Sequence, residues 1–253
     1  MARSHLARVA NVILSLDADI VHLSEIEGCD ALDALVDAVE DAGGVRGAYR
    51  PYMVPGTDTA TGQNVGLLTK LDPLLPLTRT TNRALYPIPS STCDYSDPTE
   101  PKFTYGVSKH HLARFPLTPT QSLILAGAHL LAFPDKRDRC EKREAQAAVL
   151  AGAVRALREE APRDEVLVLG DLNDFDEGVV DAAGEVDRPI SLILALVGSE
   201  LVNADLHVTM RTRTWSGIAR HHFGLPVAIL RDVAIYGVDI GAVTLGLDPG
   251  SSR

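Results

Sequence analysis

The stretch at residues 166–174, VLVLGDLND, is the part of the sequence that says most about the fold. Its apolar run, bounded by Glu165 and a glycine, is typical of a short buried strand. Gly170 allows a sharp turn, which presents Asp171 and Asn173 at the carboxyl end of the strand, where α/β proteins usually bind ligands. A carboxylate and an amide held there can bind a water molecule and a phosphoryl oxygen together. The alternative is an Asx-rich turn whose side chains only satisfy the local backbone.

Other apolar patterns predict helices that alternate with strands. We expect helices over residues 4–16, 31–42, 140–160 and 190–197, and strands over 20–23, 64–69, 122–131 and 232–236. The proline-rich segment 72–108 is expected to be a long surface excursion within the domain, because strands resume on both sides of it. The alternation predicts an α/β or α+β layered domain, and 253 residues suit one domain with a proper core.

The net charge bears on which ligands the protein can bind, and the cysteines bear on the cellular compartment in which it works. The formal net charge of −10 repels polyphosphate backbones, which disfavours unspecific binding of long nucleic acids. No apolar run is long enough to cross a bilayer, and the N-terminus has no signal-peptide pattern, so cytoplasmic is the default localisation. The cysteines have no metal-ligand spacing. Reduced thiols are therefore the default, with one disulfide left open.

Two further polar residues end predicted strands. Glu25 follows an apolar strand, where a carboxylate is costly unless it lies at the rim or binds a cation, and oxygen ligands of this kind suit Mg²⁺. Glu27 is the less favoured ligand, and a rim glutamate paired with a lysine is the alternative for Glu25. His129 is either a satisfied core histidine or a donor to a phosphate oxygen that also helps to protonate the leaving group.

These residues suggest phosphoester hydrolysis. Asp171 could take the proton of the attacking water, and Asn173 could bind the phosphorus oxygens as charge builds. Rival motifs are absent from the sequence, namely GxGxxG, the Walker lysine loop and GxSxG. The segment from Gly170 to Asp174 matches one piece of the calcineurin-like phosphoesterases, but their further histidine motifs are missing.

The ordered set of motifs resembles the endonuclease/exonuclease/phosphatase superfamily, the deoxyribonuclease-I-like fold. The segments that carry the resemblance are 8–13, 19–27, 127–130, 143–146, 170–174 and 230–235, which span most of the chain. The resemblance implies a four-layer α/β/β/α sandwich with two mixed sheets and one divalent metal, Mg²⁺ or Mn²⁺. It assigns Glu25 to the metal, His129 to the phosphate, Asp171 to the attacking water, and Asn173 to the transition state.

Two parts of the family pattern are not found. The N-terminal strand ending in a metal-site Asn and the C-terminal Ser-Asp-His are absent, so we expect a single domain that is incomplete at both ends. Asp232 aligns with the partner of the terminal catalytic histidine. In a second alignment His222, within the segment 220–227, is that histidine and Asp232 is merely downstream.

The resemblance therefore implies a Mg²⁺-dependent phosphodiesterase. Its substrate would be a nucleic acid, a phosphoinositide or a phospholipid headgroup, and no protein partner is predicted. The alternative is a catalytically inactive or truncated relative that acts as a binding domain.

Overall fold

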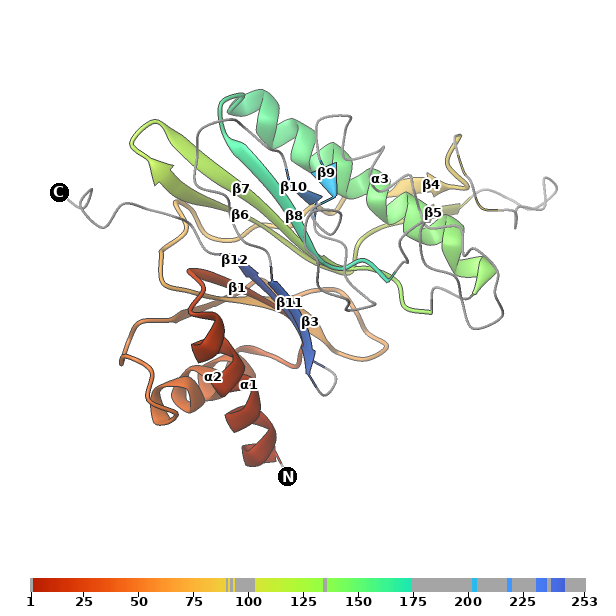
Figure 1. The fold of residues 1–253 in the computed structure, drawn as a ribbon. Helices are drawn as coiled ribbons and strands as arrows, with labels where there is room; N and C mark the ends of the chain where they lie inside the picture. The colour runs from red at the N-terminus through yellow and green to blue at the C-terminus, as the bar shows by residue number, and fades with distance from the viewer. Residues whose placement is uncertain are drawn as a thin grey trace.

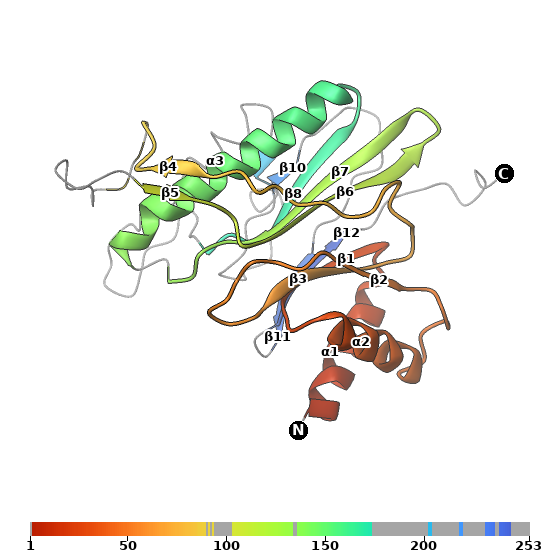
Figure 2. The same ribbon diagram turned by 180° about the vertical axis from the view of Figure 1, so that it is seen from behind.

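Two five-stranded sheets lie face to face, with helices on both outer sides (Figure 1). The computed structural model describes residues 2–89, 91, 93, 103–133 and 136–173. It also describes the backbone of the strand segments 202–203, 218–219, 231–235 and 238–243. The layers follow the order helices, first sheet, second sheet, helix, in both views of the ribbon (Figures 1 and 2).

The first sheet is covered by α1 (Ala2–Leu16) and α2 (Cys29–Asp41). Its strand order is β11-β12-β1-β3-β2. The strands are β1 (Ile20–Ile26), β2 (Arg50–Met53), β3 (Asn64–Thr69), β11 (Arg231–Ile235) and β12 (Val238–Val243). All pairings described in this sheet are antiparallel. Apolar residues that recur at helical spacing in α1 and α2 pack against β1 and β3, and this buries Ile13, Leu32 and Leu68.

The second sheet has the order β6-β7-β8-β10-β9. Its strands are β6 (Lys109–Thr118), β7 (Gln121–His129), β8 (Glu165–Asp171), β9 (Val202–Asn203) and β10 (Ile218–Ala219). Strands β7 and β8 pair in parallel, and α3 (Arg137–Glu160) provides the crossover between them. The apolar face of α3 covers the outer side of this sheet, where Leu150 and Val154 are buried in the same core cluster as Ile124 and Val166.

Strands β7 and β8 are apolar at nearly every position because both of their faces are buried. Alternate side chains such as Ile124 and Val168 face α3. Those between them, such as Leu125 and Leu167, lie between the two sheets with Phe115 of β6. The continuous apolar run at residues 166–169 is therefore explained by the position of β8 in the middle of the molecule, with both of its faces buried.

The long excursion contains a small two-stranded sheet of its own. Strands β4 (Ala84–Tyr86) and β5 (Phe103–Tyr105) pair antiparallel and lie along α3 (Figure 2). A disulfide between Cys93 and Cys140 joins the excursion to α3, and Cys29 is free and exposed. The disulfide is thus the single bridge that the cysteine count had left open.

The predicted architecture is confirmed in its main parts. The helices and strands expected within the described residues are present, and the fold is α/β with two large sheets. Only the second sheet is mixed, whereas two mixed sheets were expected. The first is antiparallel in its described pairs, since α2 and the short β2 return the chain so that β3 runs opposite to β1. The strands that had not been predicted are β2, β4, β5, β6, β9, β10 and β12. The helix expected over 190–197 lies outside the described residues.

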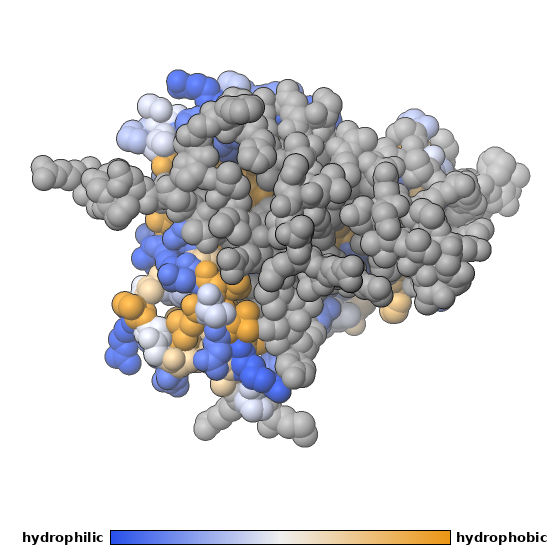
Figure 3. Space-filling model, viewed as in Figure 1, coloured by the Kyte–Doolittle hydropathy of each residue, from blue (hydrophilic) through white to orange (hydrophobic). Residues whose placement is uncertain are grey.

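The surface over α1 and α2 mixes hydrophilic and hydrophobic residues (Figure 3). In the described part of the chain, no helix combines the length and the apolar character that crossing a membrane requires.

Candidate active site

The tips of β7 and β8 bring two of the predicted residues into contact. His129 and Asp171 are the last residues of these strands and are partners in the parallel register. Nε2 of His129 lies 3.6 Å from Oδ2 of Asp171. Gly170 makes this approach possible, because its φ is +133° and a Cβ at this position would lie 2.9 Å from the backbone N and C of Ala128.

Hydrogen bonds then join the two strand tips beyond their last paired residues. The amide of Leu130 donates to the carbonyl of Asp171 at 2.8 Å, and Nδ2 of Asn173 donates to the carbonyl of Leu130 at 3.0 Å. The amide of Asn173 donates to Oδ1 of Asp171 at 2.8 Å. Asn173 has a φ of +50°, a conformation that asparagine tolerates better than most residues. Asp171 is therefore held through one carboxylate oxygen, while the other faces His129.

The imidazole of His129 is neutral at pH 7. The residue is 3% exposed, and burial lowers its pKa to about 4. The charge of Lys109 lowers the pKa further, and the charge of Asp58 opposes this effect. The contact with Asp171 is thus one between a carboxylate and a neutral ring, which favours hydrogen-bond donation to a phosphate oxygen over proton donation to a leaving group.

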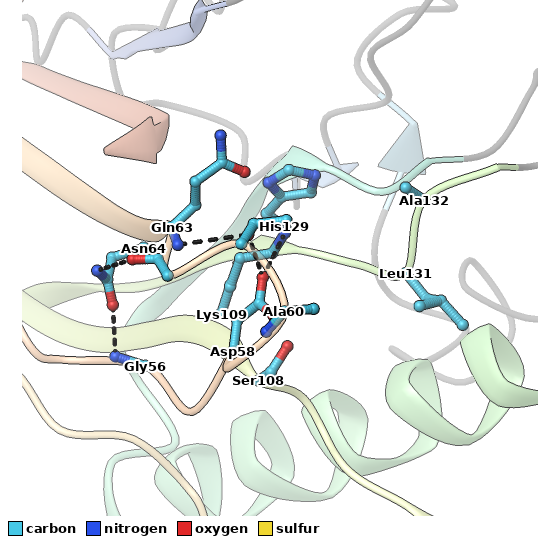
Figure 4. A network of polar contacts seen from close by, with 12 residues as sticks. Gly56, Asp58, Ala60, Gln63, Asn64, Ser108, Lys109, His129, Leu131 and Ala132 are labelled. Carbon is cyan, nitrogen blue, oxygen red and sulfur yellow. Dashed lines mark hydrogen bonds and ion pairs between the residues drawn. The ribbon is translucent and has the colours of Figure 1, made fainter. Parts of the chain in front are cut away.

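Lys109 reaches the same point from the neighbouring strand. Because β6 runs antiparallel to β7, its first residue, Lys109, lies opposite His129. The side chain of Lys109 is only 10% exposed, and its Nζ lies 3.5 Å from Oδ2 of Asp58 (Figure 4). Asp58 belongs to the loop 54–63 that leads into β3.

This loop is held by hydrogen bonds at both of its sides. Oδ1 of Asn64 accepts the amide of Gly56 at 2.7 Å (Figure 4). The amide of Thr57 donates to the carbonyl of Ser108 at 2.9 Å. The guanidinium of Arg79 donates to the carbonyl of Pro55 and to the hydroxyl of Thr57. The loop is therefore fixed to the start of β6, next to Lys109.

The same loop is attached to the end of β1, where Glu25 lies. Nδ2 of Asn64 is 3.4 Å from the carbonyls of Ile26 and of Glu27. Glu25 is half-buried, and its φ is +61° at an irregularity in the pairing of β1 with β3. Such bulges redirect side chains and are frequent near active sites. Glu25 therefore lies at the same end of the sandwich as His129 and Asp171, on the other sheet.

The donor set at this end suits a hard cation that keeps most of its own water. In the described part of the chain, no three His, Cys, Asp or Glu side chains gather closely enough to hold a metal by themselves. Mg²⁺ usually binds through one or two carboxylates and completes its shell with water and substrate phosphate. The carboxylates of Glu25 and Asp171 fit this pattern.

Two residues of α3 support the segment that follows His129. Arg143 is almost fully buried, and its Nη1 donates to the carbonyl of Phe133 at 3.2 Å. Oε1 of Gln146 accepts the amide of Leu131 at 2.9 Å, and its Nε2 donates to the carbonyl of Gly106 at 3.2 Å. The motif at residues 143–146 therefore positions backbone beside the site.

Behind the site, two histidines fill the space between the sheets. The rings of His22 in β1 and His111 in β6 have centroids 5.2 Å apart. Both face Gly127, where a Cβ would lie 2.6 Å from Nδ1 of His22 and closer still to the ring of His111. Gly127 thus provides the room that lets the two sheets approach at this level.

Asp232 is placed only by its backbone. It pairs with Gly241 of β12, which in turn pairs with His22 of β1. Asp232 is therefore level with His22 in the first sheet, three residues before Glu25 along β1. His222, the alternative to Asp232, lies outside the described residues.

Solved structures share the fold of this chain, although no family model and no curated protein matches the sequence. An endonuclease/exonuclease/phosphatase from Beutenbergia cavernae superposes with a TM-score of 0.55 at 14% identity, over 95% of this chain and 66% of the other. Truncated TDP2 from Caenorhabditis elegans superposes with a TM-score of 0.53 at 13% identity, over 96% and 90%. The chain has the endonuclease/exonuclease/phosphatase fold.

Lys109 and Asp58 had not been predicted as site residues. Lys109 directly follows the excursion 72–108, and Asp58 lies in a segment for which no helix or strand was predicted. A signal was nevertheless present, because Lys109 directly precedes two histidines and an apolar segment, as the first residue of a buried strand would.

Proposed function

We propose that this chain is a Mg²⁺- or Mn²⁺-dependent phosphodiesterase that cleaves a phosphoester with an activated water. The observation that carries the proposal is the contact of His129 with Asp171 at the tips of adjacent strands, in a chain with the endonuclease/exonuclease/phosphatase fold. A carboxylate that accepts the amide of Asn173 through one oxygen and faces His129 with the other is suited to orient a water molecule and take its proton.

The other site residues would bind the phosphate, stabilise the transition state or hold the cation. The neutral ring of His129 would donate a hydrogen bond to a non-bridging oxygen, and Asn173 would stabilise the charge that builds in the transition state. Asp232 is proposed as the partner of a terminal catalytic histidine. Glu25 would hold the divalent cation, which when bound acts as a Lewis acid towards the phosphate and the leaving group.

The substrate is proposed to be a phosphoester of a nucleic acid, a phosphoinositide or a phospholipid headgroup. The shared fold of the Beutenbergia cavernae protein, an endonuclease/exonuclease/phosphatase, supports phosphoester chemistry. The net charge of −10 favours small phosphoesters or headgroups over long nucleic acids.

The test is hydrolysis of bis-p-nitrophenyl phosphate by the purified chain, with Mg²⁺ and with EDTA. We expect turnover only with Mg²⁺, and a decrease of about 100-fold or more in Asp171→Asn, the usual cost of losing a general base. Asparagine keeps the oxygen that accepts the amide of Asn173. Asp33→Asn, on an exposed face of α2, is the matched control and should not change turnover. Turnover that equals buffer would support the inactive binding domain instead, whereas Mg²⁺-dependent turnover that persists in Asp171→Asn would refute the role of Asp171 as general base.

A further inference from the structure

Lys109 is a nearly buried cation beside the reacting residues, with no role in the mechanism above. Its only charged partner in the described residues is Asp58, at 3.5 Å. A buried ion pair is weak evidence for stability, because the cost of removing two charges from water offsets their attraction. The position of the pair next to His129 therefore points to a role in the site.

The charges at this end of the sandwich call for a cation from the protein. Glu25, Asp58 and Asp171 are carboxylates, while His129 is neutral. A phosphoester adds a further negative charge among them. An ammonium has three N–H donors, and the contact with Asp58 engages at most one of them. Lys109 thus has donors left for an oxygen of a bound anion.

Asp58 keeps its position without help from Lys109. Its Oδ2 accepts the hydroxyl of Thr61 at 2.6 Å, and its Oδ1 accepts the amide of Ala60 at 3.0 Å. The loop that carries it is fixed separately through Asn64 and Arg79. The carboxylate is therefore an anion that the loop presents to Lys109, with the charge and the oxygen chemistry of a phosphate group.

We propose that Lys109 binds a non-bridging oxygen of the substrate phosphate, and that Asp58 is the internal anion with which this phosphate competes. The inference rests on the proposed function and adds a phosphate-binding residue to it. Strand β6 delivers the ammonium opposite His129, so that one phosphate group can contact both side chains. Asp58 keeps the ammonium in place between substrates and lowers the affinity for phosphate.

The alternative hypothesis, that the pair of Lys109 and Asp58 only stabilises the loop, predicts a different result. If the pair only held the loop, removal of either partner would disturb the site in the same way. If the two groups compete as proposed, removal of the cation weakens phosphate binding and removal of the carboxylate strengthens it. The sign of the effect of Asp58→Asn therefore separates the two cases, and asparagine can still accept the amide of Ala60.

The experiment is calorimetric titration of the full chain with inorganic phosphate in EDTA, so that binding reports on the protein and not on a metal. We expect Lys109→Met to raise Kd about 10- to 100-fold, the usual value of a charged hydrogen bond. Lys109→Arg should stay close to the unmodified chain, and Asp58→Asn should lower Kd about 3- to 10-fold. Lys70→Met, which removes the lysine of the pair with Asp17, is the matched control and should leave Kd unchanged.

Three results of the titration would overturn the inference: no saturable phosphate binding by the unmodified chain, an unchanged Kd in Lys109→Met, or weaker binding in Asp58→Asn. Thermal melts of each variant show whether it is folded, and Lys109→Gln, which also removes the charge, replaces Lys109→Met if the latter is not. Hydrolysis of bis-p-nitrophenyl phosphate separates this inference from the proposed function. Turnover with an unchanged kcat/KM in Lys109→Met would refute the inference alone, whereas absence of turnover in the unmodified chain refutes the function and leaves the binding result to stand by itself.

Discussion

Gly170 has no side chain at the point where β8 lies against Ala128 of β7, just before His129 and Asp171 meet. Its φ of +133° is strained for any residue with a Cβ, and the added atom would press on the backbone of Ala128. We expect Gly170→Ala to lower the free energy of unfolding by at least about 2 kcal/mol, since backbone strain and overpacking act together.

Urea unfolding of this variant has a useful control in Gly152→Ala. Gly152 is an exposed glycine of α3 with nothing within 4 Å of an added Cβ. This second variant should stabilise the chain by about 0.5–1 kcal/mol, because alanine is the better helix former. If Gly170→Ala unfolds at the urea concentration of the unmodified chain, the close contact of the strand tips is wrong.

At the scale of elements, β1, β6 and β7 enclose histidines that the folded chain keeps neutral. Burial lowers the pKa of His22 well below its usual value, that of His111 to about 3 and that of His129 to about 4. In the unfolded chain these groups take up protons near pH 6.5. The unfolded state therefore binds more protons as the pH falls from about 6.5 towards 3, and stability decreases over this window.

His111→Leu tests this pH dependence at one position. Within the described residues, neither ring nitrogen of His111 has a hydrogen-bond partner, so the ring contributes bulk and a titrating group to the layer between the sheets. We expect the loss of stability per pH unit between about 6.5 and 3 to become smaller by up to about 1.4 kcal/mol, the value of one proton. Urea unfolding at several pH values measures the slope, and a slope equal to that of the unmodified chain would contradict the neutral, buried state of His111.

At the scale of the whole molecule, the disulfide between Cys93 and Cys140 joins the excursion to the long helix beside the second sheet. The two cysteines are 47 residues apart, and closing a loop of this length in the unfolded chain is worth about 2–4 kcal/mol. We expect a reductant, or the paired change of Cys93 and Cys140 to serine, to lower the melting temperature. Cys29→Ser, at the free and exposed cysteine, should have no effect. Equal melting of the reduced and oxidised chains would show that the bridge does not stabilise the fold.

Much of the architecture could be predicted from local patterns. The apolar runs at β1, β7 and β8 and the helical spacing of α3 appear directly in the sequence, because buried strands and amphipathic helices require those periods. Strand β6 escaped prediction since it begins with Lys109 and two histidines, polar residues that are unusual in a core. These histidines are buried through contacts with other strands, which no local pattern records.

Glu25 and Asp171 could be recognised from the sequence, because a polar residue that ends an apolar run is costly unless it lies at the rim of a sheet or binds a cation. The sequence left His129 open between a core position and the site, and only the resemblance of the ordered motifs joined the three residues as a set. Their order along the chain and their chemistry needed no further information. The pairing of Lys109 with Asp58 and the neutral state of His129 depended on the folded molecule alone. Antiparallel pairing of β6 with β7 places the ammonium opposite the imidazole, and the loop before β3 brings in the carboxylate. Tertiary packing alone brings Lys109 and Asp58 together from distant segments of the chain. Packing also excludes water from His129, and this keeps the imidazole neutral.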